Sequence, residues 1–142
     1  MLKMTSAACV ILYRKNETGN TEILTVSRKT NPKNIGIPGG KVDPGETLKH
    51  AACRELLEET GYVVCPDMLT EVLVADGDTG LDVITSCSCT TFITDTYTFQ
   101  SHTLETGVVA WLTPDCMTTD ECSFAKYNQR LINVLKTDYP AI

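Results

Sequence analysis

Long hydrophobic runs and an excess of positive charge are both missing from this 142-residue sequence. No apolar stretch approaches the roughly 18 residues that a membrane-spanning helix needs. The first residues run directly into a strand-like pattern, without the separate apolar region and cleavage site of a secretory signal. The formal charge of -6 disfavours nonspecific nucleic-acid binding, which requires a basic surface. We therefore expect a cytoplasmic protein with neither a membrane nor a nucleic acid as its partner.

Paired cysteine motifs are also missing, although the chain has seven cysteines. Seven is an odd number, so not all can form disulfides, and reduced cytosolic thiols are the default without a secretory signal. Cys87 and Cys89 share one face of a predicted strand and could be half of a zinc site. However, no CxxC pair exists, and the only histidines are His50 and His102. We favour structural or incidental thiols over zinc.

The composition is that of an ordinary folded domain. Apolar residues make up 42% and charged residues 21% of the chain, which is enough for one domain with a real core. We see no linker, repeat or low-complexity tract, so residues 1–142 are expected to form a single domain, as a monomer or a homodimer.

Apolar, β-branched runs predict the strands. Residues 7–13 and 22–27 are separated by Asn-Glu-Thr-Gly-Asn and are typical of a hairpin. Residues 30–36 are expected to form a loop, and 37–40 tight irregular backbone. Further strands are predicted at 63–64, 70–75, 83–94 and 107–112.

Two helices are predicted. The first begins after Thr47, a plausible N-cap, and ends near Thr60 with Gly61 as its stop. Its apolar stripe should face the core and consists of Leu48, Ala52 and Leu56. Thr119 or Asp120 could cap the second helix. Its apolar stripe is more typical of a core than of a nucleobase pocket and consists of Phe124, Tyr127, Leu131 and Leu135.

Three carboxylates crowd one face of the first helix. Glu55, Glu58 and Glu59 stand at i, i+3 and i+4, within roughly a 100° arc. Their mutual repulsion is unfavourable, and a hard divalent cation such as Mg²⁺ or Mn²⁺ would relieve it. Phosphate esters and anhydrides are the usual partners of such ions.

Residues 40–62, GKVDPGETLKHAACRELLEETGY, resemble the Nudix family signature, G-x5-E-x7-R-E-U-x-E-E-x-G-U with U bulky and apolar. Every fixed position matches, and Tyr62 at the last U is a mild departure. The resemblance implies an α/β fold, the α/β/α sandwich with a mixed central β-sheet.

The resemblance also implies residue roles. Glu55, Glu58 and Glu59 correspond to the metal-binding glutamates, and the carbonyl of Gly39, before the signature, to a further ligand. Arg54 would orient a catalytic carboxylate, either Glu55 or Glu46. Glu55 is our candidate for the base, although this role lies on loops in some relatives.

Three residues outside the helix are weaker candidates. Arg28 and Lys41 are the nearest cations for substrate phosphates. Glu105 lies six residues before Trp111, about where some MutT-type relatives carry a further metal-ligating acid. Trp111 itself is more often a core residue than a base-stacking platform.

The function implied is Mg²⁺-dependent hydrolysis of a nucleoside diphosphate linked to another group. The compact chain favours a MutT-type nucleoside triphosphate pyrophosphatase that releases NMP and pyrophosphate. Hydrolysis of a dinucleoside polyphosphate, ADP-ribose or a nucleotide sugar is an alternative. A noncatalytic Nudix-fold binding module is a further alternative. Such a module would be expected to have lost some of the signature carboxylates, whereas all of them are intact in this sequence.

Overall fold

The computed structural model describes residues 3–76, 85–101 and 107–140. Within these residues the strands are β1 (Lys3–Lys15), β2 (Thr21–Arg28), β3 (Asn31–Gly36), β4 (Gly39–Lys41), β5 (Tyr62–Val63), β6 (Thr70–Asp76), β7 (Thr85–Thr94), β8 (Thr98–Phe99) and β9 (Val109–Leu112). The α-helices are α1 (Leu48–Thr60) and α2 (Ala125–Asp138). Short 3₁₀ turns occur at Pro66–Met68 and Pro114–Met117.

The described strands form one large mixed sheet and one small one. The large sheet has the order β3-β2-β1-β7-β6, with β4 also paired to β1 and β9 to β2. The central pair β1–β7 is parallel, from Lys3 opposite Thr85 to Leu12 opposite Thr94, and the other pairs are antiparallel. Strands β5 and β8 form a separate antiparallel pair. The mixed sheet and the hairpin of β1 and β2 confirm the sequence-based expectations.

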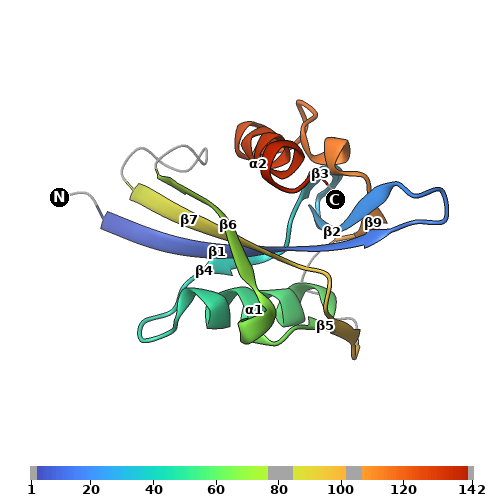
Figure 1. Ribbon diagram of the computed structural model, residues 1–142. Coiled ribbons are helices and arrows are strands. Elements are labelled where there is room, and N and C mark those ends of the chain that lie inside the picture. Colours follow the sequence, from blue (N-terminus) through green and yellow to red (C-terminus); the bar gives the residue numbers. More distant parts are fainter. Residues whose placement is uncertain (1–2, 77–84, 102–106, 141–142) are drawn as a thin grey trace.

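Helices α1 and α2 cover opposite faces of the large sheet (Figure 1). Side chains of β1 alternate between these two layers, as the pleat of a strand requires. Val10 and Leu12 pack with α1, whereas Ile11 packs with α2, and all three are fully buried. The expected α/β/α sandwich is therefore confirmed. No helix in the described residues has the length and apolar character to cross a membrane.

Two segments expected to be irregular are strands. β3 pairs with β2 at the edge of the sheet, where Pro32 is tolerated because no further strand needs its missing N–H. Gly39 and Gly40 of β4 pair with Cys9 and Ala8 of β1. Neither segment has the β-branched composition that predicts a strand, and pairing with β1 and β2 overrides local propensity.

Helix α1 has the predicted ends. The Thr47 hydroxyl accepts a hydrogen bond from the N–H of His50 (3.1 Å), and Gly61 adopts the left-handed conformation with φ of 79°. The core prediction for Leu48 was wrong, because its side chain is 37% exposed. Burial along α1 begins only at Ala51, at the end of the first turn.

Helix α2 starts later than the sequence suggested. It begins at Ala125, and its N-cap, Phe124, makes no side-chain capping bond. The residues expected to cap it form a turn instead, in which the N–H of Cys122 donates to the carbonyl of Thr119. The predicted apolar stripe is otherwise correct, and its buried members are Tyr127, Leu131 and Leu135.

Candidate functional site

Arg54 is the centre of a charged cluster on α1. Its Nε donates to Glu46 Oε2 (2.8 Å) and its Nη2 to Glu46 Oε1 (3.0 Å), so two guanidinium nitrogens bind the two oxygens of this carboxylate. Nη2 also donates to the carbonyl of Lys41 (3.0 Å) and lies 3.4 Å from Asp43. A planar fork of donors suits this two-armed contact in a way that an ammonium does not. Arg54 thereby fastens α1 to β4 and to the turn that precedes the helix.

Two of the three crowded carboxylates share the remaining guanidinium nitrogen of Arg54, Nη1. Its Nη1 donates to Glu55 Oε1 (3.1 Å) and lies 3.3 Å from Glu58 Oε2. Glu55 is the less exposed of the two, with 18% of its side chain accessible against 41% for Glu58. One guanidinium therefore offsets repulsion between acids that the helix places one turn apart.

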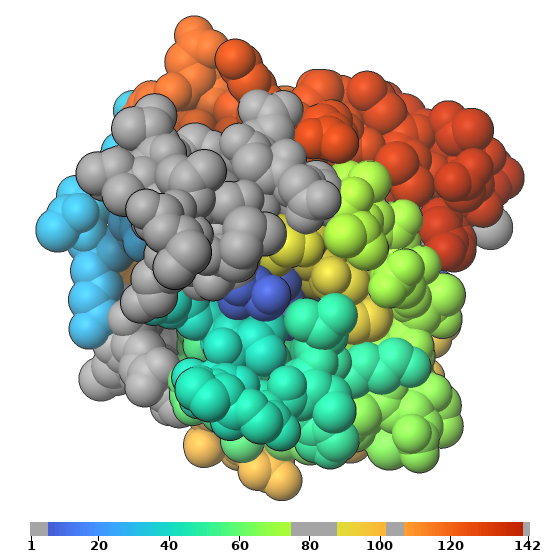
Figure 2. Space-filling view, turned by 90° about the vertical axis from the view of Figure 1, so that its left-hand side faces the viewer, coloured from blue at the N-terminus to red at the C-terminus, as the bar shows by residue number. Residues whose placement is uncertain are grey.

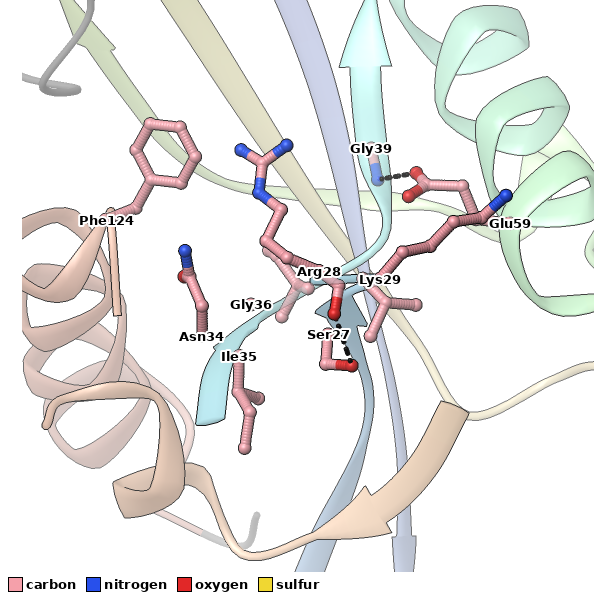
Figure 3. A pocket seen from close by; sticks show the side chains of 11 residues that line it. Ser27, Arg28, Lys29, Asn34, Ile35, Gly36, Gly39, Glu59 and Phe124 are labelled. Carbon is pink, nitrogen blue, oxygen red and sulfur yellow. Dashed lines mark hydrogen bonds between the residues drawn. The ribbon is translucent and has the colours of Figure 1, made fainter. Parts of the chain in front are cut away.

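The third carboxylate reaches β4. Glu59 Oε1 accepts a hydrogen bond from the N–H of Gly39 (2.8 Å). Figure 3 shows this contact, with Glu59 extending from α1 to the strand that carries Gly39. Next to it, a Cβ added to Gly40 would lie 2.6 Å from the carboxylate carbon of Glu55. The two glycines thus allow the α1 carboxylates to lie directly against the β4 backbone.

The Arg54–Glu46 pair perturbs both partners. Hydrogen bonds from the Arg54 guanidinium, with a smaller contribution from the N–H of Asp43, lower the pKa of Glu46 to about 2. The same contact with Glu46 raises the pKa of Arg54 above its already high ordinary value. Glu46 is therefore ionised throughout the physiological range, as a fixed anion that orients Arg54.

A cavity of about 370 Å³ opens beside this cluster. Figure 3 shows its wall, with Arg28 and Lys29 from the end of β2, Asn34 from β3 and Phe124 at the start of α2. Gly39 and Glu59 also line it, so the cavity meets the carboxylate cluster. A second hollow of about 300 Å³ adjoins it and is lined by Arg28, Gly39 and the underside of α2. The cations Arg28 and Lys29 and the Glu59 carboxylate therefore border one recess.

The structure brings together most of the residues that the sequence singled out. Glu46, Arg54 and the three α1 carboxylates form one cluster with Gly39, and Arg28 lies in the adjoining cavity. Lys41 has an exposed side chain and contributes its backbone carbonyl to Arg54. Glu105 lies outside the described residues.

Several cavity residues were not predicted as site residues from the sequence. Asn34 comes from the segment interpreted as a loop, Lys29 was given no role, and Phe124 was interpreted as a core residue. Cys9 and Cys89 line the second hollow. The alternation of side chains along β1 and β7 was the available signal for these two, because it assigns them to a face.

The oxygen donors suit a hard divalent cation, although they do not surround a single point. Within the described residues, no three His, Cys, Asp or Glu side chains form a preformed ion site. Glu55 and Glu58 nevertheless meet at one Arg54 nitrogen, and Gly40 leaves space for the Glu55 carboxylate over β4. Carboxylate and backbone oxygens are the ligands that Mg²⁺ prefers. The residues present therefore fit such an ion.

Trp111 belongs to a separate aromatic cluster. Its indole N–H donates to the Tyr62 hydroxyl (3.1 Å), and the Arg14 guanidinium lies 4.4 Å from its ring centroid. Tyr97 packs against the same ring, with centroids 5.3 Å apart. None of these residues lines either part of the recess. The preference for a packing role over base stacking agrees with this position.

Comparison with known proteins identifies the family and the fold. Residues 3–121 match the model of the NUDIX domain. The chain also resembles the crystal structure of a MutT NUDIX hydrolase from Burkholderia pseudomallei, with a TM-score of 0.70 and 20% identity. That alignment covers 92% of this chain and 98% of the other.

Curated relatives share a shorter region. A Bacillus subtilis protein provisionally named an 8-oxo-dGTP diphosphatase is 48% identical over 58 residues, 41% of this chain and 36% of that protein. An ADP-ribose pyrophosphatase of Methanocaldococcus jannaschii is 44% identical over 46 residues, 31% of this chain and 27% of that protein. The matched regions therefore span well under half the length of these two relatives.

Proposed function

Because this chain belongs to the Nudix family, we propose that it hydrolyses a phosphoanhydride bond in a nucleotide derivative with the help of a divalent cation, Mg²⁺ or Mn²⁺. The observation that carries this proposal is the junction between the carboxylate cluster and the cavity. Glu59 belongs to both, because it binds the Gly39 N–H and lines the cavity beside Arg28. Anionic groups that hold a cation and cationic groups that attract phosphate would thus meet at one place.

Glu55, Glu58, Glu59 and the Gly39 carbonyl are the proposed ligands. When bound, the ion would polarise the phosphate oxygens and neutralise charge on the leaving group. Arg54 would act as a positioning residue, because its contacts with Glu46, Glu55 and Glu58 fix two ligands relative to the helix entry. Glu46 would in turn hold Arg54 from the opposite side.

Glu55 is the proposed acceptor of the proton from the attacking water. It is the less exposed of the two acids held by Arg54 Nη1, and it lies over β4 at Gly40, next in sequence to the proposed ligand Gly39. Attack on phosphorus would form one P–O bond, break the bond to the bridging oxygen, and transfer a water proton to Glu55. Arg28 would bind the phosphate that leaves, with Lys41 as an outer cation.

The substrate we propose is a nucleoside triphosphate, cleaved to NMP and pyrophosphate. Two observations support this choice: a recess lined by Arg28, Lys29 and Phe124, and the similarity to the relative named an 8-oxo-dGTP diphosphatase. ADP-ribose is the competing substrate, because a relative with that activity in its name is 44% identical over the shared region.

A substrate panel tests the proposal. Canonical and oxidised dNTPs, ADP-ribose, dinucleoside polyphosphates and nucleotide sugars would be ranked by kcat/KM, with Mg²⁺ and after chelation. We expect a nucleoside triphosphate to rank first and to release pyrophosphate only with metal. A higher rank for ADP-ribose would overturn the substrate, and metal-bound protein without turnover on any member would overturn the hydrolase.

A further inference from the structure

Two cysteine thiols from distant parts of the chain meet beneath the recess. Cys9 Sγ on β1 and Cys89 Sγ on β7 lie 3.6 Å apart. Both strands are held in a continuous parallel register, with Ala7 opposite Cys89 and Cys9 opposite Thr91. The two side chains are therefore diagonal neighbours on one face of the sheet, the face covered by α2.

The two thiols differ in access. Cys89 is 5% exposed and packs under Tyr127 of α2, whereas Cys9 is partly exposed. Both line the 300 Å³ hollow that adjoins the main cavity. Figure 2 shows the blue segment of β1 set back from the surrounding surface, next to the yellow segment of β7. A small solute that enters the recess would meet Cys9 first and find Cys89 behind it.

We propose that Cys9 and Cys89 are a modification site, a dithiol that hydrogen peroxide oxidises to a disulfide. The Cys9 sulfur attacks one peroxide oxygen, the O–O bond breaks, and water leaves with the thiol proton, so that Cys9 becomes a sulfenic acid. The Cys89 sulfur then attacks the Cys9 sulfur, and the S–O bond breaks as a second water leaves. One peroxide is reduced to two waters, and two thiols lose two electrons.

The step requires a modest local movement. Two sulfurs 3.6 Å apart must approach by about 1.5 Å to reach the bond length of ~2.05 Å. The pairing register fixes the two strands along their length, so side-chain rotation and a slight sideways shift of β1 must supply this movement. Among the six cysteines whose thiols the structure describes, Cys9 and Cys89 make the one recorded thiol–thiol contact, and one member of this pair is partly exposed.

Oxidation would change the geometry of the carboxylate cluster through Gly39. A Cβ on Gly39 would lie 2.5 Å from Cys9 Sγ and 2.6 Å from the carbonyl of Ala8, so the paired strands β4 and β1 are in close contact at this point. Gly39 in turn donates to Glu59. Disulfide formation would draw the Cys9 sulfur toward Cys89 and away from Gly39. Gly39 would then lose this packing contact and shift relative to Glu59. This consequence for activity rests on the proposed function, whereas disulfide formation does not.

The test separates the covalent step from its consequence. Reduced protein is treated with hydrogen peroxide, free thiols are alkylated, and disulfides are located by mass spectrometry of peptides. We expect a Cys9–Cys89 link in the parent chain and in Cys122→Ser, a matched variant that loses a different buried thiol. The link should be absent from Cys9→Ser and Cys89→Ser. A link that joins other cysteines, or oxidation of Cys9 with no link, would overturn the proposal.

Activity is then compared as the ratio of oxidised to reduced kcat/KM for each chain. We expect a loss of at least about 10-fold in the parent and in Cys122→Ser, because displacement by ~1 Å at a reacting site costs up to 100-fold. Dithiothreitol should reverse the loss, and Cys9→Ser with Cys89→Ser should show none. An equal loss in the double variant would overturn the coupling. If the reduced protein hydrolyses no nucleotide, the proposed function fails, and peptide mapping still decides the dithiol.

Discussion

Arg54 and Glu46 are joined by two parallel hydrogen bonds, 2.8 Å and 3.0 Å long, that link the helix to the turn before it. The remaining nitrogen of the same guanidinium, Nη1, contacts Glu55 and Glu58. One side chain thus sets the distance between the helix entry and two of the proposed ligands.

Replacing Arg54 by Lys keeps the charge but removes the fork. We expect kcat to fall by about 10- to 100-fold, since a single ammonium cannot hold Glu46 and the α1 carboxylates together. Arg130→Lys, on the exposed side of α2, is the matched control and should change kcat little. Adding Glu46→Gln to Arg54→Lys should cost little more than either change alone, because both break one contact. Additive losses would mean that the two residues act separately.

The neighbouring glycines of β4 should respond differently to alanine. In Gly40→Ala the three atoms nearest the new Cβ all belong to the Glu55 carboxylate, the end of a side chain that can turn away, so we expect a nearly unchanged melting temperature and a clear loss of kcat. In Gly39→Ala the Cβ meets the carbonyl of Ala8 at 2.6 Å, and overpacking against backbone costs about 1–3 kcal/mol of unfolding free energy. Thermal unfolding and kinetics of both variants check this contrast. Equal destabilisation by the two changes would contradict it.

Metal should stabilise the folded chain. An ion that binds only the native state adds RT ln(1 + [L]/Kd), about 2.7 kcal/mol at 100 times Kd. Millimolar Mg²⁺ should therefore raise the melting temperature, and Glu55→Gln with Glu59→Gln should abolish the rise. Glu17→Gln, in the exposed turn between β1 and β2, is the control and should keep the rise. A metal-induced rise that survives in the double variant would place the ion elsewhere.

Replacing a single proposed ligand should also slow turnover. Glu58→Gln alone should lower kcat by about 100-fold, or ~2.7 kcal/mol, when it is measured at saturating Mg²⁺.

The depressed pKa of Glu46 predicts an acid limb in stability. Its folded pKa of about 2 lies below the ordinary 4.5, so the folded state binds the proton more weakly than the unfolded state. The stabilisation is complete above the ordinary pKa and is lost as the pH falls from about 4.5 toward 2. Urea unfolding across this range should show a shallower decline for Glu46→Gln than for the parent. Identical declines would show that Glu46 is not the group responsible.

The helix that carries the cluster was predictable because its signals are local. Thr47, Gly61 and the three spaced glutamates lie within one segment, and capping and helical periodicity act over a few residues. β3 and β4 were not predictable, since their strand character comes from pairing with β1 and β2. The meeting of Arg28 with Glu59 at one cavity, and of Cys9 with Cys89, likewise depends on register between strands far apart in sequence.

The parallel pairing of β1 with β7 also has a consequence for the order in which the chain can fold. Strands β2 and β4 follow β1 closely, whereas the segment Lys3–Leu12 obtains its other neighbour only from Thr85–Thr94. During synthesis, one edge of β1 therefore stays without a partner until residue 94 has left the ribosome. Unpaired apolar edges template association with other chains. A nascent chain paused before β7 would be the aggregation-prone species, even though the whole cluster from Gly39 to Glu59 has by then been made.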